Sequence, residues 1–307
     1  MLENCYLCKI EDNLGIRQEE RPMVVNCFQI RIFVVHMTKA DDIYTLSFPK
    51  SKNVVISGDI HGDFNQLVHK LCVQYAMRDT LLIVAGDCGF GFDNPGYYDE
   101  MVKKNSRRMS ESNNWIVFVR GNHDNPAYFD GITFRHRHFI AVPDYTVIQA
   151  CRHTILCVGG AISIDRRYRM QKWEEDNRRH TYHHTHPKDE RLVRHYYWAD
   201  ESPTYYNEML TRINERFAID TVVTHTSPSF CQLLSKRGLL SFAVSDDSLL
   251  TDVEAERNTM TDLYNRLVHD AHPLSHWFYG HFHQSWHNSI EGVLFTMLDI
   301  MEFREVY

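Results

Sequence analysis

The chain contains five short apolar runs, and each of them ends in polar residues. The runs are rich in Val and Ile and lack strict alternation of apolar and polar positions, a pattern typical of strands covered on both faces. Periodicity alone does not exclude buried helix for runs of this length. We predict strands at Asn53 to Ser57, Thr80 to Ala85, Trp115 to Val119, Thr221 to Thr224, and His276 to Tyr279.

Segments with helical spacing lie between these runs. Apolar residues recur at intervals of three or four positions over residues 67 to 75 and 206 to 217. Ser202 followed by Pro203 predicts the start of the second of these helices. A longer helix is predicted from about Asp246 to His269, before the fifth run. Strands and helices therefore alternate, as in an α/β protein.

The length and charge of the chain limit the possible functions. Its 307 residues are enough for one large α/β domain or two small ones. The net charge of -7 argues against a broad basic face on nucleic acid, because such binding depends on Lys and Arg that neutralise phosphates. A local basic groove remains possible, so we expect nucleic acid only as a substrate.

Cysteine usage and the N-terminal residues predict a cytoplasmic protein. The 8 Cys form no disulfide or zinc-finger pattern, so reduced thiols are expected. The N-terminus lacks the basic start and apolar run of a secretory signal. The apolar stretch from Pro22 to His36 is interrupted by polar residues and is shorter than the roughly 20 residues of a membrane helix. We predict strands there and no membrane association.

Each of the five runs is followed by groups that can bind a metal ion. Ligands of α/β sheets bind beyond the carboxyl ends of strands, so these groups should converge. Carboxylate, amide oxygen and imidazole, without thiolate, suit borderline-hard divalent ions, and two such ions can clamp both oxygens of a phosphoryl displacement. Neighbouring glycines should let the backbone approach the ions. The groups are Gly58-Asp59-Ile60-His61-Gly62, Gly86-Asp87, Gly121-Asn122-His123-Asp124, His225, and Gly280-His281-Phe282-His283.

In this order the motifs resemble those of the calcineurin-like metallophosphoesterases. That family carries Gly-Asp-x-His, Gly-Asp, Gly-Asn-His-Asp/Glu, a lone His, and Gly-His-x-His, and all five occur here between about residue 52 and the C-terminus. The resemblance implies a four-layer αββα sandwich, in which two mixed β-sheets are flanked by helices. We therefore expect a metallophosphoesterase domain over residues 51–307. Residues 1–50 precede the pattern of strands and helices and carry no recognisable chemistry, so we predict an N-terminal extension that packs on the core. Residues about 171–200, which are rich in His, are predicted to be an exposed insertion.

The resemblance further implies a role for each motif residue. A hydroxide between two ions would be the nucleophile, its pKa lowered by their charge. His123 would stabilise the transition state or protonate the leaving oxygen. Mn is expected, and Fe, Zn, Ni or Co also suit these ligands. One ion would be bound by Asp59, His61 and His283 and the other by Asn122, His225 and His281, with Asp87 as the bridge.

The second motif departs from the protein Ser/Thr phosphatases. After Asp87 the chain continues Cys88-Gly89-Phe90-Gly91, so it lacks that branch's phosphate-binding Arg and the Asp that orients the catalytic His. A segment that starts at Gly159 is similar to one found in small bacterial members of the superfamily and carries Arg166 and Arg169. Either arginine could bind the substrate phosphate through paired N–H donors, or lie on the surface.

We therefore expect an enzyme that hydrolyses phosphate esters. A phosphomonoesterase or small phosphodiesterase on nucleotides, nucleic-acid ends or phosphoprotein fits best. A nuclease of the same superfamily is the first alternative. A non-catalytic scaffold with the same fold is the second, but it should have lost metal ligands, and all seven are present together with His123.

Overall fold

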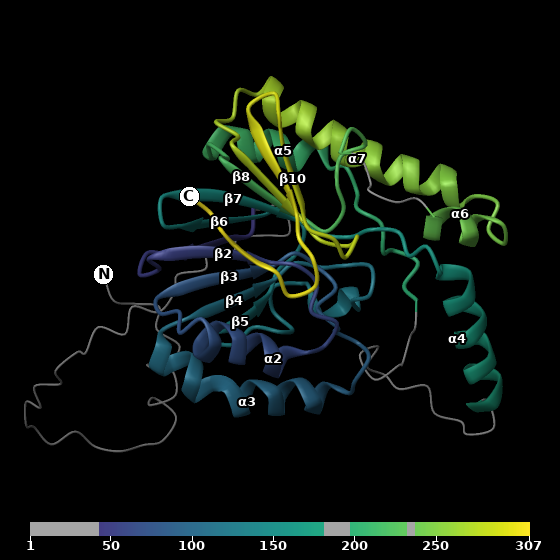
Figure 1. Ribbon diagram of the computed structural model, residues 1–307, viewed down its shortest axis with the longest axis horizontal. Coiled ribbons are helices and arrows are strands. Elements are labelled where there is room, and N and C mark those ends of the chain that lie inside the picture. Colours follow the sequence, from purple (N-terminus) through teal and green to yellow (C-terminus); the bar gives the residue numbers. More distant parts are fainter. Residues whose placement is uncertain (1–42, 181–196, 232–236) are drawn as a thin grey trace, which may run out of the picture. The chain divides into compact units, whose positions relative to one another are not determined.

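The computed structural model describes residues 43–180, 197–231 and 237–307. Two β-sheets lie face to face with helices on their outer faces (Figure 1). The five-stranded sheet contains β2 (Asn53–Ser57), β3 (Thr80–Val84), β4 (Trp115–Phe118), β5 (Phe139–Ala141) and β12 (Phe303–Glu305). The seven-stranded sheet contains β1 (Thr45–Phe48), β6 (Thr146–Ala150), β7 (His153–Val158), β8 (Thr221–Thr224), β9 (His276–Tyr279), β10 (Trp286–Ile290) and β11 (Val293–Met297).

The helices are α2 (Phe64–His69), α3 (Pro95–Ser112), α4 (Arg166–His180), α5 (Asn207–Arg216), α6 (Arg237–Ala243) and α7 (Leu249–His269). Helices α2 and α3 cover the outer face of the five-stranded sheet, and α5 and α7 cover that of the seven-stranded sheet. A π-helical turn, Lys70–Gln74, follows α2, and a 3-10 turn spans Pro126–Tyr128. No helix in the described ranges is both long and apolar enough to cross a bilayer.

Both sheets are mixed. In the five-stranded sheet, β2, β3, β4 and β5 pair in parallel and β12 joins antiparallel to β2. In the seven-stranded sheet, β7, β8, β9 and β11 form a parallel set, and antiparallel β6 and β10 lie on either side of it. Parallel strands point their carboxyl ends to one edge, so the predicted ligand loops after β2, β3 and β4 share an edge, as do those after β8 and β9.

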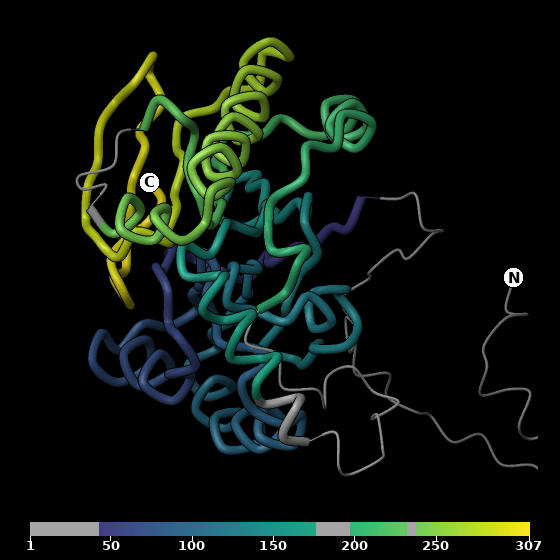
Figure 2. Tube along the Cα trace, turned by 90° about the vertical axis from the view of Figure 1, so that its right-hand side faces the viewer, coloured from purple at the N-terminus to yellow at the C-terminus, as the bar shows by residue number. Residues whose placement is uncertain are grey.

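Three apolar layers hold the sandwich together. Val54 and Ile56 pack in the core between the two sheets, whereas Val55 packs toward α2 and α3. A third core joins the seven-stranded sheet to α5 and α7, and Figure 2 shows the helices above and below the strands. Adjacent residues of a strand point to opposite faces of its sheet. Where apolar layers cover both faces of a sheet, as at β2, a strand needs no alternating polar positions. The predicted four-layer αββα fold is confirmed.

The predicted strands match closely, but one helix begins later than expected. The strands β2, β8 and β9 have the predicted bounds, and β3 and β4 end one residue early. Helix α5 begins at Asn207 and not near Ser202. The hydroxyl of Tyr145 donates to the carbonyl of Thr204 at 2.7 Å and accepts from the N–H of Tyr206 at 3.0 Å. This tertiary contact takes backbone groups that an earlier helical turn would use.

The predicted extension and insertion lie mostly outside the described ranges. From the extension the structure describes β1, which pairs in parallel with β6 of the seven-stranded sheet. From the insertion it describes the end of α4 and the segment from residue 197 onward. The strands expected between Pro22 and His36 and the His cluster at residues 183–195 fall outside these ranges, so both stay predictions.

Candidate metal centre

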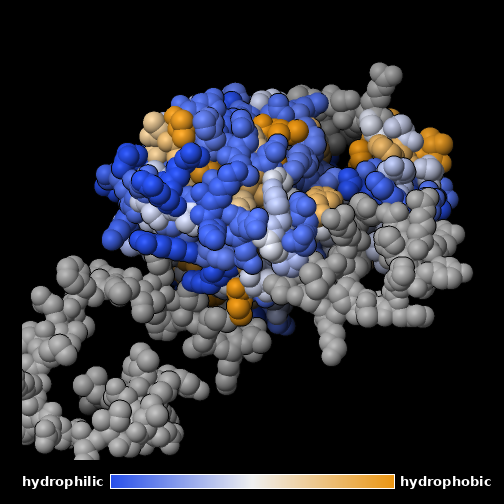
Figure 3. Space-filling model, turned by 90° about the horizontal axis from the view of Figure 1, so that it is seen from below, coloured by the Kyte–Doolittle hydropathy of each residue, from blue (hydrophilic) through white to orange (hydrophobic). Residues whose placement is uncertain are grey.

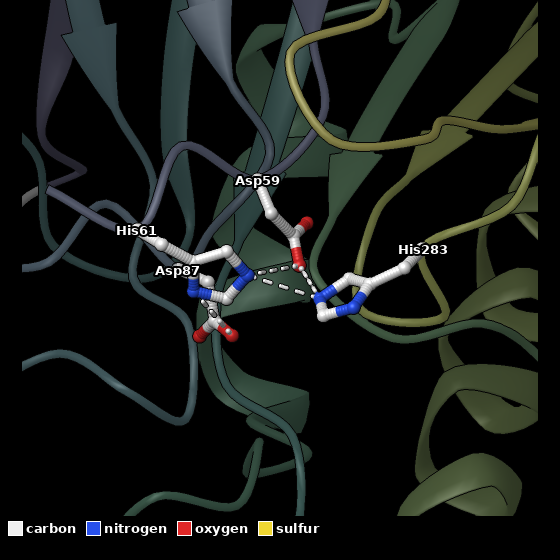
Figure 4. A group of neighbouring side chains, drawn as sticks. All are labelled: Asp59, His61, Asp87 and His283. Carbon is white, nitrogen blue, oxygen red and sulfur yellow. Dashed lines mark hydrogen bonds and ion pairs between the residues drawn. The ribbon is translucent and has the colours of Figure 1, made fainter. Parts of the chain in front are cut away.

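Ligand atoms from three separate loops converge at the first part of the site. Asp59 and His61 follow β2, Asp87 follows β3 and His283 follows β9, and each offers one atom within 4.8 Å of the others. Oδ2 of Asp59 lies 3.0 Å from Nε2 of His283 and 3.8 Å from Nε2 of His61. The two Nε2 atoms are 3.0 Å apart. Figure 4 shows these three side chains pointing toward one another, with Asp87 beside them.

This arrangement fits a divalent metal ion. Oδ2 of Asp59 is buried and has no well-aligned hydrogen-bond donor among the described residues, and Nε2 of His283, 3.0 Å away, forms an ion pair with it only when that ring is protonated. A buried carboxylate oxygen left without a partner costs about 1–3 kcal/mol or more. A metal ion would satisfy it and would also accept the lone pairs of the two imidazoles.

A second set of ligand atoms lies on the other side of Asp87. Nε2 of His225 is 2.9 Å from Oδ1 of Asn122 and 3.2 Å from Oδ1 of Asp87. Nδ1 of His225 donates to the carbonyl of Ala85 at 2.7 Å, and this leaves Nε2 to face the site, as is usual for a metal-ligating histidine. Oδ2 of Asp87 lies 4.0 Å from the ring of His61, so Asp87 sits between the two sets.

The charges of the buried groups favour a cation in this place. Burial lowers the pKa of His225, but the carboxylates of Asp87 and Asp59 outweigh it and raise the pKa to about 10. Burial raises the pKa of Asp87, and His225 and His123 hold it well below its usual range. In the metal-free protein, the proton on His225 therefore supplies positive charge beside two carboxylates. A divalent ion would supply more positive charge there and would displace that proton.

His281 is held in the form that a metal ligand needs. Burial, together with the charge of His225, keeps its pKa well below the usual range, so the ring is neutral. Its ring centroid lies 5.0 Å from that of His225. Its backbone N–H donates to Oδ1 of Asp59 at 2.9 Å, and that of His123 donates to Oδ1 of Asp87 at 2.9 Å. Each carboxylate is thus fixed by a backbone donor from another motif.

The backbone at the site is strained. The φ angles are 47° at His61, 47° at Asp87, 68° at His281 and 50° at His283. These are left-handed values, which cost a residue other than glycine about 1–3 kcal/mol and persist where the surrounding structure enforces them, often at functional sites. The strand-end motifs did not reveal this feature, because φ is set by the loop conformation.

The glycines of the motifs make room for the carboxylates. A Cβ on Gly121 would lie 2.2 Å from Oδ1 of Asp87, and one on Gly280 would lie 2.1 Å from Oδ1 of Asp59. The expectation was that glycine lets the backbone approach the metals. The nearest atom is the backbone nitrogen of Asp87 at Gly121 and Oδ1 of Asp59 at Gly280, and the approach of the backbone to the metals stays a prediction.

Two buried residues that the motifs did not indicate hold Asn122 in place. Nδ2 of Asn122 donates to Oγ of Ser163 at 2.8 Å. Ser163 in turn donates from Oγ at 2.6 Å and from its backbone N–H at 2.8 Å to the carboxyl group of Glu201. All three residues are buried, and burial raises the pKa of Glu201 to about 8. Ser163 lies in the segment after Gly159, whereas no sequence signal marks Glu201.

Asp124, the last residue of the third motif, has a structural role. Its carboxyl group is buried and accepts from the backbone N–H groups of Cys88 at 3.0 Å, Gly89 at 2.7 Å, Phe90 at 2.9 Å and Gly121 at 2.8 Å. Asp124 therefore joins the loop after β3 to the loop after β4, and so keeps Asp87 beside Asn122.

His123 is oriented by an arginine from α4. NH2 of Arg169 lies 3.2 Å from Nδ1 of His123, and its Nε donates to Oδ1 of Asp165 at 2.7 Å. Because a guanidinium only donates hydrogen bonds, Nδ1 is the acceptor and the ring proton is on Nε2. Burial lowers the pKa of His123, and Arg169 adds to this effect. A neutral ring with an Nε2–H donor results.

The two predicted phosphate-binding arginines lie in different surroundings. Arg169 lines a cavity of about 370 Å³ together with Asp87, Asn122, His123, His281 and His283. Arg166 binds Asp246 from Nε at 2.7 Å and from NH2 at 3.0 Å, and Asp252 at 2.6 Å. It therefore fastens the start of α4 to α7 and the residues before it. Of the two, only Arg169 lines the cavity and contacts His123, whereas the guanidinium of Arg166 is directed to carboxylates of and before α7.

Comparison with known proteins supports the resemblance to the calcineurin-like metallophosphoesterases. The calcineurin-like phosphoesterase family profile matches residues 52–285. Protein TT1561 of Thermus thermophilus is similar in structure, with 13% identity, coverage of 81% of this chain and 90% of that chain, and a TM-score of 0.47. The phosphopantetheinyl hydrolase of Mycobacterium tuberculosis has 14% identity, coverage of 81% and 91%, and a TM-score of 0.34.

GAP50, described as the anchor in the inner membrane complex of Plasmodium, has 10% identity, coverage of 81% of this chain and 72% of that chain, and a TM-score of 0.36. A search of curated proteins found no match.

The match to the family profile covers most of the chain and contains all five strand-end motifs. The chain therefore belongs to the calcineurin-like phosphoesterase family.

Proposed function

We propose that this protein is a metal-dependent phosphoesterase that holds two divalent metal ions. The observation that carries the proposal is the position of Asp87, whose carboxylate lies between two sets of ligand atoms. Asp59, His61 and His283 would hold one ion, and Asn122, His225 and His281 would hold the other. Bound ions would supply a hydroxide nucleophile at neutral pH and offset the charge of the phosphoryl oxygens. We propose Mn, with Fe, Zn, Ni or Co as alternatives of similar ligand preference.

His123 and Arg169 would act on the substrate. The Nε2–H of the neutral His123 ring would donate a hydrogen bond to the departing oxygen and stabilise the charge that develops there, whereas transfer of the proton itself would require the imidazolium form of the ring. The contact of Arg169 with Nδ1 keeps that proton on the side away from the arginine. The guanidinium of Arg169, which lines the cavity, would bind a phosphoryl oxygen of the substrate.

We propose phosphate monoesters or small diesters as substrates, with a nucleotide or a phosphoprotein as the source. No observation on the described surface favours the nuclease alternative. A non-catalytic scaffold is disfavoured because the predicted ligand atoms converge around a buried carboxylate oxygen of Asp59. We also propose a cytoplasmic location, because the cysteines in the described ranges are free, as is usual in a reducing compartment.

The test begins with metal-free protein. Mn, Fe, Zn, Ni or Co is added singly, and hydrolysis of phosphomonoesters, diesters, dinucleotides and phosphopeptides is measured against metal content. We expect activity to return as the second equivalent of metal binds. Absence of hydrolysis with every metal, in protein that binds two ions per chain, would support the scaffold instead. Activity that survives metal removal would refute the metal-dependent mechanism.

A further inference from the structure

The cavity beside the proposed metal centre has an apolar side. Its polar side consists of the ligands, His123 and Arg169. Gly238, Asp165, Glu256 and Gln284 complete the lining. The apolar side is formed by Ile164, Leu239, Phe242, Val253 and Phe282, and we call these five residues the apolar wall.

The apolar wall is only partly covered by the rest of the protein. Phe242 is 37% exposed, and the other four residues are partly buried. Figure 3 shows a mainly hydrophilic surface with several separate hydrophobic patches, one of them at the right-hand edge, the side where α4 and α6 lie in Figure 1. Apolar surface left in water is unfavourable by about 25 cal/mol per Å² relative to burial. A ligand that covers the wall would therefore gain binding energy.

The wall is held in a fixed position relative to the catalytic groups. Phe282 lies between the predicted ligands His281 and His283 in the chain. Leu239 and Phe242 belong to α6 and Val253 to α7. The ion pairs of Arg166 with Asp246 and Asp252 fasten this part of the molecule to α4, which carries Arg169. The cavity volume of about 370 Å³ lies within the range of about 300–1,000 Å³ for small-molecule sites.

These features indicate what kind of alcohol is released from the phosphate. The phosphoryl group belongs at the ligands, so the alcohol part of the ester extends along the remaining lining. A polyhydroxy sugar or glycerol would lose hydrogen bonds with water against the apolar wall, whereas a flat apolar group would lose none. Resting on the proposed function, we propose that the substrate is a phosphate ester whose alcohol part carries an aromatic or other flat apolar group.

The test compares two primary alkyl esters that differ mainly in polarity, phenylpropyl phosphate and glycerol phosphate. For the metal-loaded enzyme, kcat/KM should be about tenfold or more higher for phenylpropyl phosphate than for glycerol phosphate, mostly because KM is lower. A difference of this size corresponds to burial of part of the phenyl ring. Phe242→Ala should reduce this preference about tenfold, and thermal unfolding would show that the variant is folded.

The matched control is Leu240→Ala. Leu240 is on the same helix and is 56% exposed, but it does not line the cavity, so the preference should stay unchanged. Equal or faster hydrolysis of glycerol phosphate would overturn the proposal, as would equal effects of Phe242→Ala and Leu240→Ala. Failure of the proposed function looks different, because neither ester would then be hydrolysed in a metal-dependent way.

Discussion

The side-chain amide of Asn122 donates to Oγ of Ser163 at 2.8 Å, and its Oδ1 is thereby turned toward His225, 2.9 Å away. Ser163 is held by the buried carboxyl group of Glu201. Without this chain of hydrogen bonds the amide could rotate and present nitrogen, which does not bind a metal ion. Asn122 is thus oriented by residues that lie about 40 and 80 positions further along the chain.

Ser163→Ala should weaken metal binding on the Asn122 side of the site. Loss of a contact that orients a ligand typically costs 10–100-fold in metal affinity, so we expect one of two ions to be lost on dialysis. Asp144→Asn is the control. Asp144 accepts from the N–H of Gly159 at 2.7 Å and from Arg120 at 3.0 Å, and does not contact Asn122. Elemental analysis that finds two tightly held ions in Ser163→Ala would contradict the positioning role.

Asp87→Ala should disturb both ions at once. Its two carboxylate oxygens face opposite sets, with Oδ1 3.2 Å from His225 and Oδ2 4.0 Å from His61. His283→Ala, which removes a ligand of one set, should chiefly affect one ion. Metal titration of the two variants measures the difference. Two ions per chain and near-normal turnover in Asp87→Ala would show that Asp87 is not the bridge.

His123→Ala and His123→Asn should leave metal content intact and slow the chemical step. If His123 acts in its imidazolium form and gives its Nε2 proton to the departing oxygen, hydrolysis of esters with poor leaving groups should slow by roughly 100-fold or more. p-Nitrophenyl phosphate, whose leaving group is stable as an anion, should lose much less. Equal losses on both kinds of ester would indicate stabilisation of the phosphoryl oxygens, and loss of a metal ion would make His123 a ligand.

Arg169→Ala should lower catalytic efficiency, whereas Arg166→Ala should lower the stability of the fold. If Arg169 binds the phosphate, its removal should lower kcat/KM by the equivalent of about 1.5–3 kcal/mol. Arg166→Ala leaves the largely buried carboxylate of Asp246 without its bidentate partner, so it should lower the free energy of unfolding by ~1–3 kcal/mol. Kinetics and denaturant unfolding of both variants test this. Reversed effects would exchange the two roles, and unchanged kinetics in both would remove the segment from the site.

The sequence predicted five of the twelve described strands and the types of ligand, and the resemblance to the family implied the layer architecture. In the run Asn53–Ser57 the central residues Val54, Val55 and Ile56 are apolar because both faces of the strand are covered, and this property is local to the run. The ligand motifs are also local, since each follows its own strand directly. Parallel pairing then places the strand ends at a common edge, which the order of the motifs already indicated.

Only the tertiary structure decided how the ligands are held and which neighbouring groups can act. Glu201 supports Asn122 from a segment 79 positions away, and no pattern near either residue predicts that contact. Arg166 and Arg169 are three positions apart, yet carboxylates near α7 engage the first and the second reaches His123. The start of α5 was likewise set by Tyr145 of a distant strand end. Local sequence determines which groups are available, whereas contacts between distant segments determine which of them are already paired.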